Sequence, residues 1–260
     1  MRKRGLALAL LAVTALPGCG VGVHFAGYRH ELTADADVSG PVKALDVNED
    51  SGRVTITTGG SGVKIHRTVH YQDGTPHPGQ RLDNGTLTFT KGCSRCSVDY
   101  ELAVPASVTV RARSDSGTLD ISGVATADAE SDSGSVKVRS VKGAVRAHSD
   151  SGSVTAEDLG GTLDIASESG SVRAIGLRST TVRASSDSGS LRLEFAAAPT
   201  NVRATTDSGS LHVTVPGGPY NVEANSDSGT RKISAVPHDP SAPRRLYLRT
   251  DSGSLTAERA

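Results

Sequence analysis

The sequence predicts an all-β fold, a right-handed parallel β-solenoid (β-helix) built from coils of about 18–20 residues. Three observations lead to this prediction. An Asp-Ser-Gly motif recurs along most of the chain, apolar residues alternate with polar ones on both sides of it, and large side chains are scarce. Hydrophobic residues make up 36% of the chain and aromatic residues 3%, and there is no Trp. Val, Leu and Ala can fill only a thin core, which is what stacked narrow coils require.

The repeat sets the length of the coil. Successive motif glycines lie 17 to 24 residues apart, at Gly117, Gly134, Gly152, Gly170, Gly189, Gly209, Gly229 and Gly253. An earlier copy is Asp50-Ser51-Gly52, and Asp83-Asn84-Gly85 resembles a degenerate one. Self-similarity at a period near twenty residues indicates a solenoid.

Two strands flank each motif. Apolar residues stand five and three positions before the acid and four and six positions after it, as in Val145, Ala147, Val154 and Ala156 around Asp150. Alternation with a period of two is typical of a strand with one buried face. Arg231 is the one break at these positions. Each coil is therefore strand, tight corner, strand and return loop, and parallel stacking of such coils is expected to be right-handed.

The N-terminus predicts export and lipid anchoring. Arg2, Lys3 and Arg4 precede a short apolar stretch that ends in Leu16-Pro17-Gly18-Cys19, which resembles a bacterial lipobox. We expect residues 1–18 to be a lipoprotein signal peptide and Cys19 to carry the lipid, with ordinary secretion as the alternative. Residues 19–40 have no periodicity and are expected to form a lipidated tether. The protein should then be extracytoplasmic and anchored to the cell membrane.

The remainder, residues 41–260, is expected to be one β-solenoid domain, with irregular first coils over 41–107 and regular Asp-Ser-Gly coils over 108–260. Without the first eighteen residues the chain has 25 basic and 28 acidic residues. This balance does not favour nucleic acid as a partner, because nucleic-acid binding calls for a concentrated basic face.

Two further cysteines, Cys93 and Cys96, lie close together in sequence. In an oxidising compartment such a pair favours a disulfide that pins a local turn, with redox or metal chemistry as the alternative. His66 and His70 lie four residues apart in a segment that alternates as a strand, which places them too far apart to share one metal ion. We expect them to be solvated surface residues.

The corner acids form a column in a stacked solenoid, roughly 4.8 Å apart. We expect them to accept hydrogen bonds from turn amides, with the motif glycines supplying positive φ angles and calcium binding as a minor alternative. The motif serines have no accompanying base and are not expected to be nucleophiles. The column comprises Asp115, Asp132, Asp150, Glu168, Asp187, Asp207, Asp227 and Asp251.

The Asp-Ser-Gly coils, together with the segment in which Cys93 and Cys96 precede a strand ending in Val104-Pro105, resemble the bacterial β-strand-repeat family commonly labelled putative adhesins, a domain of unknown function. The resemblance spans about residues 41–260 and implies no catalytic residues. From the residues themselves we expect no bound metal and no cofactor. The expected function is a non-catalytic cell-envelope lipoprotein whose rigid solenoid binds an envelope protein or a cell-wall polymer. The alternatives are an envelope-stress sensing or regulatory accessory protein and a polysaccharide-active β-helix enzyme.

Overall fold

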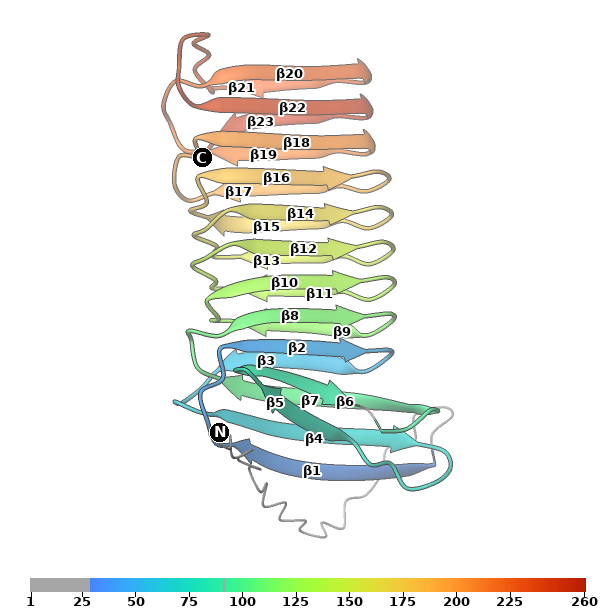
Figure 1. The fold of residues 1–260 in the computed structure, drawn as a ribbon. Coiled ribbons are helices and arrows are strands. Elements are labelled where there is room, and N and C mark those ends of the chain that lie inside the picture. Colours follow the sequence, from blue (N-terminus) through green and yellow to red (C-terminus); the bar gives the residue numbers. More distant parts are fainter. Residues whose placement is uncertain (1–28, 91) are drawn as a thin grey trace, which may run out of the picture.

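The structure, a computed structural model, describes residues 29–90 and 92–260, and this part of the chain contains strands but no helix. The strands form two long sheets that stack along one axis (Figure 1). The twelve-stranded sheet has the order β1 (His30–Val38), β4 (Val63–Tyr71), β7 (Cys96–Val104), β3 (Arg53–Thr58), β9 (Thr118–Ser122), β11 (Val136–Arg139), β13 (Val154–Glu157), β15 (Val172–Leu177), β17 (Leu191–Phe195), β19 (Leu211–Val215), β23 (Leu255–Arg259), β21 (Arg231–Ser234).

The eleven-stranded sheet has the order β20 (Asn221–Ser228), β22 (Arg245–Ser252), β18 (Asn201–Ser208), β16 (Thr181–Ser186), β14 (Leu163–Ser167), β12 (Val145–Ser149), β10 (Thr126–Ser131), β8 (Thr109–Ser114), β2 (Ala44–Glu49), β6 (Thr86–Thr90), β5 (Gly79–Asp83). From β2 and β3 to the C-terminal end, neighbouring strands in both sheets are parallel, as the repeat predicts. The all-β solenoid of long parallel sheets is thereby confirmed.

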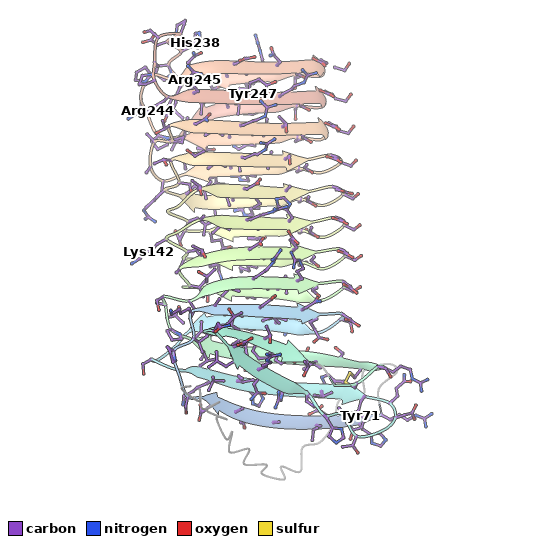
Figure 2. The ribbon with its side chains drawn as sticks, in the orientation of Figure 1. Tyr71, Lys142, His238, Arg244, Arg245 and Tyr247 are labelled. Carbon is purple, nitrogen blue, oxygen red and sulfur yellow. A yellow bond between two sulfur atoms is a disulfide. The ribbon has the colours of Figure 1, made fainter. Side chains whose placement is uncertain are left out.

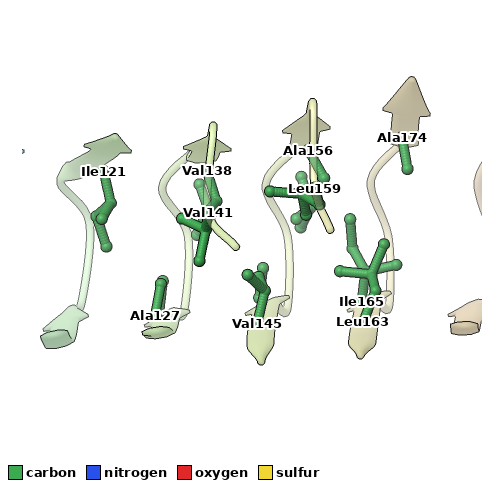
Figure 3. Packing of buried hydrophobic residues seen from close by; sticks show 14 of the residues in the cluster. Ile121, Ala127, Val138, Val141, Val145, Ala156, Leu159, Leu163, Ile165 and Ala174 are labelled. Carbon is green, nitrogen blue, oxygen red and sulfur yellow. The ribbon is translucent and has the colours of Figure 1, made fainter. Parts of the chain in front are cut away.

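The core lies between the two sheets. The residues expected to point inward in the regular coils are buried except in β20 and β21, where Val222 is half-buried and Arg231 and Ile233 are exposed. The residues between them face solvent. Return-loop residues such as Val141 and Leu159 are also buried and close the side of the solenoid opposite the corners. Figure 3 shows this arrangement, with the two sheets contributing Ile121, Val138, Ala156 and Ala174 on one side and Ala127, Val145, Leu163 and Ile165 on the other.

The N-terminal end departs from the sequence-based expectations in two ways. His30–Val38, assigned above to the tether, forms β1 and pairs antiparallel with β4, because Ala36 and Val38 supply an inward apolar face. Asp83-Asn84-Gly85 is not a degenerate corner. It belongs to the hairpin that joins the antiparallel strands β5 and β6, and Asn84 and Gly85 have φ angles of 51° and 85°, as two-residue hairpin turns require.

The C-terminal coils do not stack in sequence order. Strands β22 and β23 insert between the coil of β18 and β19 and the coil of β20 and β21, so that β20 and β21 form the end of the solenoid. The inserted coil contributes Leu246, Leu248 and Leu255 to the interior, and all three are buried. The end coil instead carries Arg231 at an inward position, where its guanidinium donates a hydrogen bond to the Ala224 carbonyl at 2.8 Å. A charged residue suits a sheet edge, so this order buries the more apolar coil.

Candidate functional site

Most corner glycines are needed for close stacking and not for positive φ. None of the motif glycines from Gly117 to Gly209 has a positive φ, which corrects the expectation for these coils, whereas Gly229 and Gly253 at the C-terminal end have φ angles of 159° and 150°. A Cβ on Gly152 would instead overlap the carbonyl oxygen of Gly134 in the preceding coil, and the same holds from Gly117 to Gly209 along the column. Backbones that pass this closely leave no room for a side chain, which explains the motif glycine at each coil.

The residue before each acid caps the corner. Ser149 is buried, accepts a hydrogen bond from the Gly152 amide at 2.8 Å, and donates one to the Gly134 carbonyl at 2.9 Å. Ser114, Ser131 and Ser167 accept the equivalent hydrogen bond from the glycine three residues on. The capping oxygen therefore comes from this buried serine, and not from the following acid as the sequence analysis expects.

The corner acids lie at the surface. From Asp115 to Asp207 their side chains are exposed, and the corner backbone forms a hydrogen-bonded ladder from coil to coil. The acids at the C-terminal end have a partner, because Arg249 bonds both Asp227 at 2.9 Å and Asp251 at 3.0 Å. Among residues 29–90 and 92–260, no group of three or more His, Cys, Asp or Glu side chains is arranged to hold a metal ion. The column therefore has the geometry of a solvated edge.

Cys93 and Cys96 form a disulfide with a Cα–Cα distance of 5.9 Å, next to the start of β7. Cys19 lies outside the described residues. No helix long and apolar enough to cross a membrane occurs in the part of the chain that the structure describes.

The two histidines lie on the outer face of β4. His66 contacts the Asp35 carboxylate at 2.6 Å, whereas His70 lies between Glu31 and Asp99, at 3.7 and 3.5 Å. Only 19% of the His70 side chain is exposed, so it is less solvated than the sequence analysis expects. These contacts join β4 to its antiparallel neighbours β1 and β7.

A buried polar cluster at the N-terminal end was missed by the sequence analysis. Glu49 and Arg67 are 1% and 4% exposed, and the Arg67 guanidinium donates to the Gln80 side-chain oxygen at 2.8 Å. Burial, followed by the nearby Glu49 carboxylate, raises the pKa of the Tyr100 hydroxyl, which is also buried. The signal was present in the alternation, because Arg67 occupies an inward position between Ile65 and Val69. This cluster is closed to solvent and lies where the N-terminal cap meets the regular coils.

A groove lies on the outer face of the eleven-stranded sheet in the regular coils. It has a volume of about 560 Å³ and crosses five adjacent strands, from β8 to β16. Its floor is the backbone of inward-facing residues such as Val145 and Leu163. One wall is a row of small side chains and the other a row of alternating charges, comprising Thr109, Thr126, Ala144, Thr162 and Thr181 in the first row and Asp128, Arg146, Asp164 and Arg183 in the second.

Ion pairs balance the charge along most of this face. Arg111 lies 3.6 Å from Asp128, and Glu130 pairs with Arg113 at 2.8 Å and Arg146 at 3.6 Å. The hydrogen bond from Arg113 lowers the pKa of Glu130 and keeps this carboxyl ionised. Opposite charges on neighbouring strands therefore pair across the stack, which is favourable between adjacent strands.

Comparison with known proteins agrees with this architecture. No curated protein matches the chain. A crystal structure of a putative adhesin from Bacteroides fragilis NCTC 9343 aligns with a TM-score of 0.50 and 15% identity, covering 89% of this chain and 98% of that one. A crystal structure of a putative adhesin from Parabacteroides distasonis ATCC 8503 aligns with a TM-score of 0.51 and 11% identity, covering 89% and 97%. At these identities the likeness concerns the fold.

The family model described as Toastrack DUF4097 matches residues 42–254, which is most of the chain. The match agrees with the resemblance seen in the repeat and in the segment around Cys93 and Cys96. The chain belongs to the Toastrack DUF4097 family.

Proposed function

We propose that this protein is an exported lipoprotein, anchored through Cys19, whose solenoid is a non-catalytic binding surface for an envelope protein or a cell-wall polymer. The observation that carries the proposal is the groove on the eleven-stranded sheet, which runs along the axis of the stack for five strands. Strands spaced about 4.8 Å apart give it a length of about 19 Å. A groove of this shape suits an extended partner that lies parallel to the axis.

The proposed layout has a signal peptide at residues 1–18, a tether from Cys19 to the start of β1, and the solenoid beyond. Its regular coils are proposed to wind right-handed with about 18–20 residues each, the handedness that parallel crossover connections adopt almost always. A stack of coils that share hydrogen bonds along both sheets is stiff, and stiffness lowers the entropic cost of binding a long partner.

The acids of the groove favour binding over hydrolysis. Asp128 lies 3.6 Å from Arg111 and takes part in the ion-pair network of the groove wall. The partner is therefore proposed to be held without being cleaved.

Site-specific crosslinking in intact cells tests the proposal. A photo-reactive residue placed at Thr162, on the wall of the groove, should give a discrete crosslinked product with an envelope component. The same residue at Thr155, on the outer face of the twelve-stranded sheet, is the matched control and should give little. Equal crosslinking from both positions, or none from Thr162, would contradict a binding role for the groove.

The anchor is tested separately. Changing Cys19→Ser should move the protein from the membrane fraction to the soluble extracytoplasmic fraction or the medium. A wild-type protein that is already fully soluble after export would contradict lipid anchoring.

A further inference from the structure

The charge balance of the groove ends abruptly towards the C-terminal end of the solenoid. On β16, β18 and β22, the outward positions between the return loop and the corner hold four arginines and no carboxylate. The outward residues on these three strands are Thr181, Arg183, Ser185, Asn201, Arg203, Thr205, Arg245, Tyr247 and Arg249. On β8, β10, β12 and β14 the corresponding positions hold three arginines and three carboxylates. The excess of positive charge is therefore local.

Three of these arginines are available to an external anion. Arg249 is engaged by Asp227 and Asp251. Arg183, Arg203 and Arg245 are exposed, and within the described residues none of them has a carboxylate within 4.0 Å. The Arg203 guanidinium lies over the ring of Tyr247, 4.3 Å from its centroid, in a cation–π contact. Figure 2 labels Arg245 and Tyr247 near the C-terminal end of the stack.

These residues continue the charged row of side chains beyond the end of the groove. Arg183 lines the end of the groove, pairs in register with Arg203, and Arg203 pairs in register with Tyr247 of the inserted coil. Adjacent strands place Arg183 and Arg203 about 4.8 Å apart at the backbone, where like charges repel unless an anion lies between them. We call Arg183, Arg203, Arg245 and Tyr247 the basic end of the groove.

We propose that the groove and its basic end bind a linear anionic polysaccharide, a chain of sugar units that carries carboxylate or phosphate groups. This inference rests on the proposed function and specifies its partner. Exposed arginines recognise carboxylate and phosphate through charge-assisted hydrogen bonds. The row of small side chains on one wall of the groove carries a threonine hydroxyl on four of five successive strands. This spacing suits the hydroxyl groups of an extended sugar chain. Tyr247 adds an aromatic ring at the end of the opposite, charged row.

The order of the C-terminal coils is essential to this surface. Because β22 inserts next to β18, Tyr247 pairs in register with Arg203, and Arg245 pairs with Asn201 two residues earlier. In sequence order the neighbour of Arg203 would be Glu223, which instead pairs with Tyr247 on the far side of the inserted strand. The insertion therefore replaces a carboxylate beside Arg203 with an aromatic ring and an additional cation.

Calorimetric titration of the purified protein with polygalacturonate oligomers tests the inference. The wild type should bind, and the affinity should fall with rising salt because the contacts are exposed charges. The double variant Arg183→Gln/Arg203→Gln should bind about tenfold more weakly, since each exposed charge contact contributes modestly. The matched control, Arg173→Gln/Lys232→Gln, removes two exposed cations from the outer face of the other sheet and should change the affinity less than about twofold.

Two further ligands make the outcome decisive. A neutral oligosaccharide of the same length should bind much more weakly, and equal binding would overturn the requirement for anionic groups. Inorganic polyphosphate of matched charge should also bind more weakly than polygalacturonate, and equal binding would show that charge alone suffices and overturn the polysaccharide assignment. Failure of polygalacturonate to bind, or equal loss in both double variants, would overturn the inference itself. Crosslinking from Thr162 does not depend on the charge of the partner. It therefore tests the proposed function separately from the inference that the partner is an anionic polysaccharide.

Discussion

Replacing Gly189 by alanine adds a single methyl group at a point where two coils touch. The new Cβ would overlap the carbonyl oxygen of Gly170 and lie 2.8 Å from the Ser186 hydroxyl oxygen. Both neighbours are held in place, because the Ser186 hydroxyl itself donates to the Gly170 carbonyl at 3.2 Å. The methyl group can be accommodated only if the two corners separate.

Separation would strain or break the ladder on either side of the corner. The bonds at risk are Ser188 N–H to the Glu168 carbonyl and Ser208 N–H to the Asp187 carbonyl, both 2.8 Å long, and the Ser186 bond described above. Three hydrogen bonds at a net contribution of about 1 kcal/mol each give a loss of about 3 kcal/mol, within the range of overpacking in a tight interior. For a chain of this size that corresponds to a fall in Tm of roughly 6–12 °C.

Thermal unfolding followed by circular dichroism measures the effect, and amide hydrogen exchange localises it to the corners on either side of Gly189. Gly160→Ala is the matched control, since a Cβ at that return-loop glycine would lie 3.6 Å from its nearest neighbour, the Lys142 carbonyl oxygen. The control should change the free energy of unfolding by less than about 0.5 kcal/mol. A Gly189→Ala variant as stable as this control would refute the close-approach explanation of the repeat.

Three other predictions concern the corners and the cap. Ser149→Ala should cost about 2 kcal/mol, because it leaves a buried amide and a buried carbonyl without their partner, whereas Ser151→Ala at the exposed position of the same corner should be nearly neutral in the same unfolding assay. Asp187→Asn should change Tm little, and EDTA should leave the Tm of the wild type unchanged. A large fall in Tm on adding EDTA that the variant abolishes would establish a cation at the column of corner acids. Protein taken from its native compartment should gain no mass on alkylation without reductant, since Cys93 and Cys96 are bonded, and two alkylated thiols would contradict the disulfide.

Much of the regular solenoid could be predicted because its information is local and repeated. The alternation around each motif identifies which side chains point inward, and the inward residues of the central coils, such as Val145 and Ala147, are buried as expected. The motif period identifies which coils share a register, and Ala127 does pair with Val145. In a repeat of this kind the same contact recurs in every coil, so one irregular position does not hide the pattern.

The reason for each motif residue could not be obtained in this way. A glycine requirement can reflect a positive φ or a lack of space, and the motif alone does not separate the two. At Gly152 the space is taken by the carbonyl oxygen of Gly134, eighteen residues earlier, so the answer depends on the distance between coils. The capping role likewise passes from Asp150 to Ser149, because in the stack the serine is buried beside the amide it accepts from and the acid is exposed.

The amino-acid sequence by itself determined the coil, namely two strands, a tight corner and one apolar face, since period-two alternation and turn chemistry act within a few residues. Only the tertiary structure decided how the ends close and where the basic end of the groove lies. The hairpin at Asn84 and Gly85, strand β1 and the insertion of β22 beside β18 all depend on which apolar faces remain uncovered once the regular coils have stacked. Tyr247 meets Arg203 for the same reason: burying the leucines of the last coil in the interior is more favourable than leaving them at an open edge.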